Sequence, residues 1–224
     1  MRGIILYFFG DWLRQCAVAQ SNIFYSQMLS KTHIITQIET NFPQFKVWQL
    51  SKLGEGWDHQ AYQVNNDYVF RFPKSKEVSK NLAKEICILP KIQSRLNLKI
   101  PDFELIGMDS NTETLFVGYK QIKGTFLTKQ VFNNLPKEIQ EKSLAEIALF
   151  FGDLHTFTVE EIEDCNLEII DFYQDYKQDY QILKNCIFER ITFKEKELID
   201  RIFCDYLDNS ENFNYIPCLL HNDL

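Results

Sequence analysis

Apolar and polar residues alternate in short segments between residues 45 and 122, the pattern of β-strands that bury one face. Five such segments follow one another, at residues 45–53, 59–64, 68–73, 100–108 and 114–122. Turn-forming residues separate them, among them Asn65-Asn66-Asp67 and Asp109-Ser110-Asn111. We therefore expect an antiparallel sheet built from these segments.

Apolar residues at helical spacing predict the other elements of the chain. Helices are expected at residues 34–42 and 77–96, and Pro90 is expected to kink or end the second one. After Lys123-Gly124 only helical spacing remains, over residues 127–135, 136–157, 169–183 and 198–203. The aromatic stripes of the last two are most simply core packing. This order predicts an α+β protein whose sheet is followed by a helical part, with the boundary at 119–124.

Charge divides the chain into two parts. The 224 residues are 45% hydrophobic, which is enough for a globular core, and the net charge is -7. Residues 1–136 hold 16 Lys+Arg against 11 Asp+Glu, a net +5, whereas residues 137–224 hold 8 against 20, a net -12. An anionic ligand suits the first part and a cationic ligand the second, unless the acidic residues are only solvated helix faces. A nucleic-acid partner is disfavoured because the helical part is acidic.

The six cysteines and four histidines show no ligand or disulfide pattern. They contain no C-x-x-C pair and no regular spacing, so we expect neither a zinc site nor a disulfide framework. The cytoplasm is then the simplest location.

Residues 1–27 resemble a signal peptide, but their apolar run is short and is interrupted by Asp11 and Arg14. The run is also too short to span a membrane. We expect an extension that is disordered or wrongly assigned to the protein, with Met28 as the true start.

Arg71 and Glu85 are expected to form an ion pair. In the segment 68–73 the aromatic residues share one face, which leaves Arg71 on the other. Glu85 lies beside the apolar stripe of the next helix, where a carboxylate is costly to bury unless a cation meets it. A strand cation paired with a helix glutamate orients nucleotide phosphates in kinases. A salt bridge at the rim, or an exposed glutamate, fits the spacing as well.

Two further features point to phosphate chemistry. Gly54 and Gly56 allow a backbone to bend close to a ligand, as a loop over phosphates requires, although Gly-x-Gly is also an ordinary hairpin turn. At the end of the chain, apolar residues lead into His221-Asn222-Asp223, which would deliver one carboxylate to the edge of a cleft. Alone, Asp223 could equally be a solvated tail residue.

Taken in order, these motifs resemble the aminoglycoside phosphotransferases, a family with a protein-kinase-like fold, and especially the type that modifies a 2''-hydroxyl. The similarity covers roughly residues 30–224. It is carried by Gly54-Glu55-Gly56-Trp57-Asp58-His59-Gln60-Ala61-Tyr62, Val69-Phe70-Arg71-Phe72-Pro73-Lys74, Asn81-Leu82 with Glu85, Gly118 through Gly124, Leu154-His155 and Pro217-Cys218-Leu219-Leu220-His221-Asn222-Asp223.

The resemblance implies a role for each matched residue. Gly54 and Gly56 would lie in the loop that covers the nucleotide, and Arg71, with Lys74 as a less favoured alternative, would contact phosphate and pair with Glu85. The resemblance also implies a linker between the two lobes.

In that linker, Tyr119 to Ile122, backbone groups of Lys120 and Ile122 would hydrogen-bond the purine. Asp223 would accept or orient the proton of the attacking hydroxyl. The implied domains are an extension at 1–27, a nucleotide-binding lobe at 28–118, a hinge at 119–124 and a helical substrate lobe at 125–224.

One part of the family pattern is missing from these 224 residues. In the family an Asn follows the catalytic Asp by about five positions, and an Ile-Asp-x-x-Asp segment follows that, together holding Mg²⁺. We expect the metal ligands beyond residue 224, and we expect the 224-residue chain to be inactive or nearly so and poorly soluble.

The function expected from the resemblance is transfer of the terminal phosphate of ATP or GTP to a hydroxyl of an aminoglycoside. A kinase of another small metabolite, such as choline, homoserine or a macrolide, and a non-catalytic nucleotide-binding remnant are the alternatives. The expected partners are a nucleotide and a small cationic substrate, with neither nucleic acid nor membrane.

Overall fold

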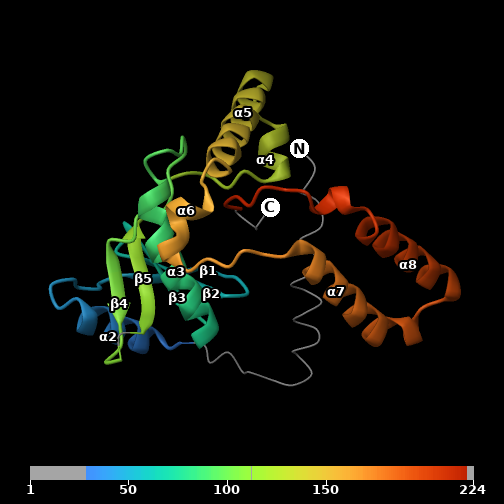
Figure 1. Ribbon diagram of the computed structural model, residues 1–224. Helices are drawn as coiled ribbons and strands as arrows, with labels where there is room; N and C mark the ends of the chain where they lie inside the picture. The colour runs from blue at the N-terminus through green and yellow to red at the C-terminus, as the bar shows by residue number, and fades with distance from the viewer. Residues whose placement is uncertain (1–28, 112, 221–224) are drawn as a thin grey trace. The chain divides into compact units, whose positions relative to one another are not determined.

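The computed structural model describes residues 29–111 and 113–220 (Figure 1). They form two compact units, one from residues 29–167 with 218–220 and the other from residues 168–217. The expected extension at residues 1–27 and the candidate base Asp223 lie outside the described residues. Among the described helices, none combines the length and the apolar character needed to cross a membrane.

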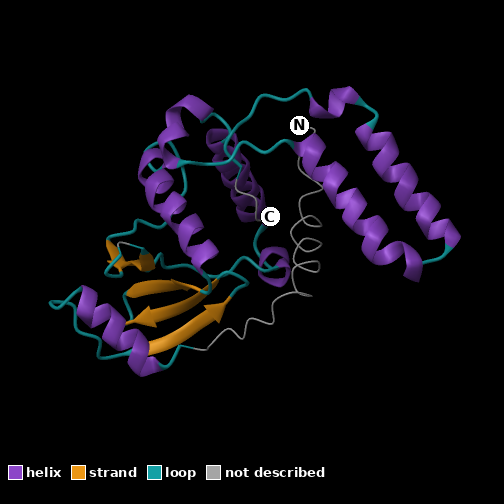
Figure 2. Cartoon of the chain, turned by 60° about the horizontal axis from the view of Figure 1, so that its bottom comes forward, coloured by secondary structure: helices purple, strands orange, loops and turns teal. Residues whose placement is uncertain are grey.

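The first unit contains the expected antiparallel sheet of five strands (Figure 2). The strand order is β1-β2-β3-β5-β4, and every neighbouring pair is antiparallel. The strands are β1 (Leu50–Glu55), β2 (His59–Val64), β3 (Tyr68–Pro73), β4 (Leu105–Met108) and β5 (Thr114–Lys120). The sequence prediction of the sheet is therefore confirmed.

Aromatic residues fill the core on one face of this sheet. Helix α2 (Lys31–Asn41) contributes Ile34 and Ile38, and the strands contribute Phe70, Phe72 and Phe116. The rings of Phe72 and Phe116 lie 4.9 Å apart. A β-carbon on Gly118 would stand 2.6 Å from the ring of Phe70, so only glycine fits at this point of β5.

Helix α3 (Lys76–Ile92) follows β3 and begins at Ser75, whose hydroxyl accepts a hydrogen bond from the N–H of Val78. The helix continues through Pro90 and ends two residues later at Ile92, before the predicted end at residue 96. Ser79 donates a hydrogen bond to the carbonyl of Thr114 in β5 and so fixes the start of α3 on the sheet.

A second hydrophobic core joins α3 to the helices that follow the sheet. These are α5 (Lys137–Leu154), α6 (Val159–Ile162) and the 3₁₀ turn η1 (Glu163–Cys165). The short helix α4 (Lys129–Asn133) precedes them and has no buried residue. The buried members of this core are Ile88, Ile92, Leu154, Phe157, Ile162 and Cys165. The predicted helix at 136–157 is shorter than expected, because the chain turns after Leu154 to place α6 on the same core.

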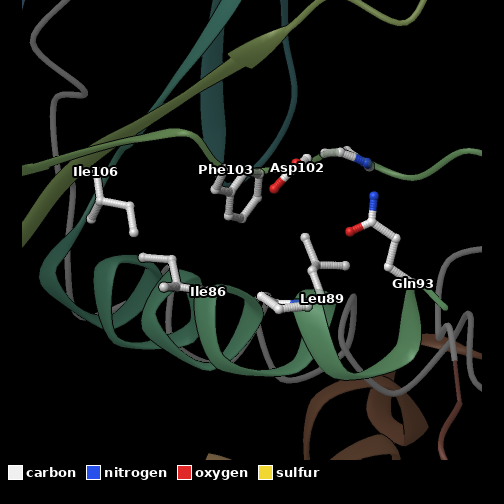
Figure 3. A pocket seen from close by; sticks show the side chains of 8 residues that line it. Ile86, Leu89, Gln93, Asp102, Phe103 and Ile106 are labelled. Carbon is white, nitrogen blue, oxygen red and sulfur yellow. The ribbon is translucent and has the colours of Figure 1, made fainter.

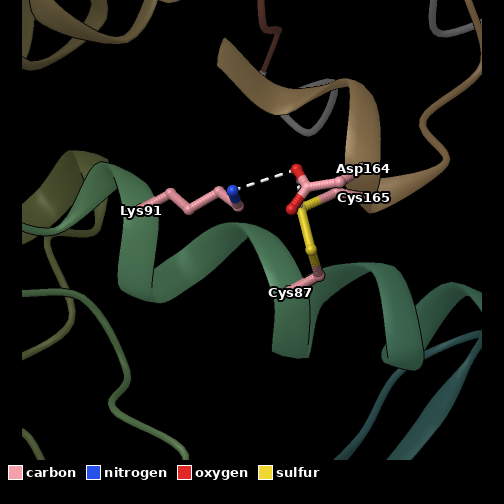
Figure 4. Close-up of a disulfide and its surroundings, with 4 residues drawn as sticks. All are labelled: Cys87, Lys91, Asp164 and Cys165. Carbon is pink, nitrogen blue, oxygen red and sulfur yellow. Dashed lines mark hydrogen bonds and ion pairs between the residues drawn. A yellow bond between two sulfur atoms is a disulfide. The ribbon is translucent and has the colours of Figure 1, made fainter.

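A disulfide bond between Cys87 and Cys165 crosses this core (Figure 4). The expectation that the cysteines form no disulfide was therefore wrong for this pair. The two residues are 78 positions apart, and only the packing of α3 against η1 brings them together. Beside the bond, Lys91 pairs with Asp164 at 2.9 Å.

The second unit is a pair of helices with an aromatic core of its own. Helices α7 (Phe172–Ile187) and α8 (Phe193–Leu207) are joined by the turn η2 (Phe188–Arg190), and η3 (Ser210–Phe213) follows. The ring of Tyr180 stacks on Phe203 at 4.8 Å, and Tyr176 meets Tyr206 at 5.2 Å. The aromatic stripes are thus core packing, as predicted.

We expect the disulfide to contribute strongly to the stability of the first unit. A bond that closes a loop of this length adds about 4.5 kcal/mol to the free energy of unfolding in the chain-entropy relation. Removing it with Cys87→Ser should therefore lower the melting temperature by roughly 9–18 °C. Thermal unfolding followed by circular dichroism, with and without a thiol reductant, measures the effect.

The matched control is Cys186→Ser, because Cys186 is a free and exposed cysteine of α7. It should leave the melting temperature unchanged, and reductant should bring the wild type down to the value of Cys87→Ser. A wild-type melting temperature that does not respond to reductant would contradict the prediction.

Candidate functional site

The ion pair predicted between Arg71 and Glu85 is present. Strand β3 directs Phe70 and Phe72 into the aromatic core and leaves Arg71 on the opposite face. There Nη1 of Arg71 donates to Oε2 of Glu85 at 2.8 Å, and Nη2 donates to Oε1 at 3.2 Å. The two parallel bonds make a bidentate contact, which fixes direction as well as distance.

Both partners are partly withdrawn from solvent, with 21% of the Arg71 side chain and 35% of the Glu85 side chain exposed. The pair joins the third strand to helix α3, so it sets the position of that helix on the sheet. The guanidinium carbon of Arg71 also lies 6.0 Å from the centre of the Phe103 ring. Glu85 and the ring of Phe103 therefore both hold the Arg71 side chain in position.

His59 is a member of this site that the sequence analysis did not single out. It begins β2, and its Nδ1 lies 3.4 Å from Nη2 of Arg71. Its Nε2 is buried and has no hydrogen-bond partner among the described residues. Burial, with a smaller contribution from the charge of Arg71, lowers the pKa of His59 to about 4.

A signal for His59 does exist in the sequence. Ala61 lies opposite Arg71 in the register of β2 and β3, and His59 lies two residues before Ala61 on the same face. The alternation that placed Arg71 on this face therefore also places His59 there. The signal requires the strand register, which the sequence pattern does not fix.

The glycine pair forms the connection between β1 and β2. Gly54 lies in β1 and Gly56 directly follows it, and neither has a positive φ. A β-carbon built on either glycine would meet no described atom within 4 Å. The packing of the described chain therefore does not require these glycines, and there is space beside the loop. A hairpin turn is observed, and a role in covering a ligand stays a prediction.

Lys74 directly follows β3, and its side chain contacts this loop and not Glu85. Its ammonium donates to the carbonyl of Gly56 at 2.7 Å and pairs with Glu55 at 2.6 Å. Lys52 meets the same carboxylate at 2.5 Å. The hydrogen bond from Lys52, followed by that from Lys74, lowers the pKa of Glu55 to about 2. Of the two cations that the resemblance offered as partner of Glu85, the structure selects Arg71.

The three predicted linker residues lie at and after the end of β5. Tyr119 is paired with Val69 of β3, and its ring lies 5.7 Å from Phe103. Burial raises the pKa of Tyr119, and the charges of Arg71 and Glu85 also act on it. Lys120 is the last residue of the strand, and Ile122 lies beyond it with 44% of its surface exposed. Contact of these residues with a purine stays a prediction.

A small pocket lies next to the site, between α3 and residues 101–106 (Figure 3). Ile86, Leu89 and Phe103 give it an apolar lining, and Gln93 and Asp102 lie at its polar end. It contains none of the predicted nucleotide-binding residues. Phe103 connects the pocket with the candidate site, because the same ring borders the pocket and faces Arg71.

The described residues do not provide a magnesium site. The one group of potential metal ligands found among them is Cys87, Asp164 and Cys165, and the two sulfur atoms of this group are joined to each other. Mg²⁺ prefers oxygen ligands in octahedral arrangement, which this group does not offer. The resemblance places the metal ligands after residue 224, and that assignment stays a prediction.

Comparison with known proteins identifies the fold. No protein-family model matches the sequence. Among solved structures, the GDP and kanamycin complex of APH(2'')-IIIa superimposes with a TM-score of 0.81 at 29% identity, over 87% of this chain and 65% of that protein. The GDP complex of wild-type aminoglycoside 2'-phosphotransferase-IIIa matches with a TM-score of 0.80 at 28% identity, over 86% and 64%.

A more distant match is macrolide 2'-phosphotransferase type I, with a TM-score of 0.60 at 17% identity, over 88% of this chain and 66% of that protein. At this identity the likeness shows the fold alone. The chain thus has the protein-kinase-like α+β fold that the resemblance implied, and it spans slightly less than two thirds of the length of the more similar proteins.

The low pKa of His59 predicts a pH dependence of stability. Between pH 6.5, the ordinary pKa, and about pH 4, the unfolded chain binds a proton at this residue that the folded chain does not. The free energy of unfolding should therefore fall as the pH is lowered through this range. His59→Gln removes this contribution and should give a flatter profile in urea unfolding at several pH values.

His33→Gln is the control for that measurement, because His33 is an exposed histidine of α2. It should keep the wild-type slope. Identical slopes for the wild type and His59→Gln would contradict the assignment of a low pKa to His59.

Proposed function

We propose that this chain, which has the fold of the aminoglycoside 2''-phosphotransferases, binds a purine nucleotide beside the Arg71–Glu85 pair and supports its use in phosphoryl transfer. The observation that carries the proposal is the bidentate contact between a strand arginine and the glutamate of the following helix. A strand cation held in this way by a helix glutamate orients the phosphates of the nucleotide in kinases.

The resemblance that assigns Arg71 and Glu85 to the nucleotide also assigns the remaining contacts. Gly54 and Gly56 would bring the loop backbone over the phosphates, where the space beside them is open. Tyr119, Lys120 and Ile122 would line the purine site at the end of β5. The proteins with this fold have been solved with GDP and with ATP or ADP, so either purine is a candidate.

We propose an aminoglycoside as the acceptor of the phosphate. Proteins of this fold have been solved with kanamycin, gentamicin and streptomycin. An aminoglycoside is a polycation, and residues 137–224 carry 8 Lys+Arg against 20 Asp+Glu, which favours such a substrate. Because both ATP and GTP are supplied in the cytoplasm, we place the protein there.

In the proposed reaction, the protein positions the groups and balances their charge. Arg71 would bind a phosphate oxygen at the reacting end of the nucleotide, and Glu85 would keep the guanidinium in place. Asp223 would accept or orient the proton of the acceptor hydroxyl as its oxygen attacks the terminal phosphorus. Magnesium, when bound in such kinases, neutralises phosphate charge.

Exchanging Arg71 and Glu85 for alanine tests the nucleotide site. Arg71→Ala should weaken the binding of GDP or ADP by about 10- to 100-fold, as expected for a lost hydrogen bond to a charged group. Glu85→Ala should weaken it less, and the double variant should bind about as well as Arg71→Ala, because Glu85 acts through Arg71. Isothermal titration calorimetry gives the dissociation constants.

Lys142→Ala, which removes an exposed cation from α5, is the matched control and should bind like the wild type. Independent losses that add in the double variant would show that the pair does not act as a unit. A wild-type chain that binds neither GDP nor ADP would refute the nucleotide site.

The second test is transfer itself. A polypeptide of residues 1–224 contains Asp223 but not the Asn and Ile-Asp-x-x-Asp residues expected to hold magnesium, so we expect nucleotide binding without phosphorylation of kanamycin. Mass spectrometry of the antibiotic after incubation with ATP or GTP measures this. Phosphorylated kanamycin that disappears with Asp223→Asn would show that the 224 residues suffice.

A further inference from the structure

We propose that His59 is a second phosphate-binding residue, whose Nε2–H acts beside Arg71 to hold an anionic oxygen of the bound nucleotide. This inference rests on the proposed nucleotide site and adds to it a residue that neither the motifs nor the comparisons assign. The observation behind it is a buried ring nitrogen that lacks a partner among the described residues, next to the arginine of the site.

The identity of the neighbour fixes the position of the proton on the His59 ring. Every nitrogen of a guanidinium donates and none accepts, so Nδ1, which faces Nη2 of Arg71, must be the acceptor. In a neutral imidazole the other nitrogen then carries the hydrogen. The buried Nε2 is therefore a donor, and the partner it requires is an acceptor.

The surroundings of His59 favour an anion as that acceptor. Arg71 on β3 is the nearest charged group, and its guanidinium would repel a cation. Glu85 on α3 already makes two bonds to Arg71. In folded proteins, nearly all buried polar groups have a hydrogen-bond partner. A buried group without one is expected where a ligand supplies that partner.

The position in the chain also connects His59 with the glycine loop. The N–H of Gly56 donates to the carbonyl of His59 at 3.0 Å, so the residue lies where the loop enters β2. Arg71 and the loop are therefore both direct neighbours of His59.

The charge state is consistent with a neutral donor. Burial lowers the pKa of His59 to about 4, so the ring is uncharged at neutral pH. Besides Arg71, Glu85 is the other charged group that acts on the ring, and it raises the pKa. His59 would then add a directed hydrogen bond and Arg71 the positive charge.

Two variants separate this role from a structural one. His59→Leu removes the donor with little change in volume, and His59→Gln keeps an N–H donor. We expect His59→Leu to weaken the binding of GDP and ADP by about tenfold, while the affinity for guanosine and adenosine, which lack phosphate, stays within about twofold. His59→Gln should retain most of the wild-type affinity.

Thermal unfolding supplies a second readout. His59→Leu removes a buried donor without a described partner, which favours the folded state, and the 3.4 Å contact with Arg71, which opposes it. Its melting temperature should therefore stay within about 4 °C of the wild type, although its nucleotide affinity falls. A residue with a purely structural role would show a lower melting temperature and an unchanged nucleotide affinity.

The outcomes distinguish this inference from the proposed function. If the wild type binds GDP or ADP and His59→Leu binds it equally well, His59 is not a phosphate ligand, and the nucleotide site stands. Equal losses for the nucleotide and the nucleoside would also overturn the inference, because the effect would then not concern phosphate. Failure of the wild type to bind either nucleotide would overturn both.

Discussion

The position of helix α3 depends on the charge contact between Arg71 and Glu85. A carboxylate beside the apolar stripe of a helix is tolerated only where a cation meets it, and β3 presents that cation on the face turned away from the aromatic core. The same bidentate contact aims the guanidinium, because a fork held at two nitrogens cannot rotate freely. In the proposed nucleotide site, stability and ligand recognition would therefore use this one interaction.

The opposite half of α3 is fixed by different means. Ile88 and Ile92 enter the second hydrophobic core, and the Cys87–Cys165 bond joins the helix covalently to η1. Glu85 lies only two residues before Cys87, so the helix turn that carries the carboxylate is held on one side by charge and on the other by a covalent bond and apolar packing. Such a rigid support is what a phosphate-orienting residue needs, since small displacements weaken directed hydrogen bonds.

The sequence predicted the features that depend on local periodicity. Alternation placed Arg71 opposite the aromatic residues, and helical spacing placed Glu85 beside the apolar stripe. The residue pattern therefore offered the ion pair, with a salt bridge at the rim or an exposed glutamate as alternatives that fitted it as well. His59 and the disulfide were not predictable in this way, because each depends on how two segments meet in space. The position of His59 beside Arg71 follows from the register of β2 on β3, and the pairing of Cys87 depends on the packing of η1 against α3. Alternation has a period of two, but it does not say which residues of neighbouring strands are opposite each other.

The acidic charge of the second half has structural uses that a count of residues does not reveal. Asp171 accepts the hydrogen bond that begins α7, and Glu195 completes the capping box of α8. Asp200 accepts a hydrogen bond from Tyr180 and lies 3.4 Å from the ammonium of Lys184, while Asp164 pairs with Lys91. Each of these carboxylates stabilises the fold by a local contact. Any attraction for the proposed polycationic substrate would therefore come from the other acidic residues. Mutations that probe substrate binding should avoid these four, since their loss would act through helix stability first.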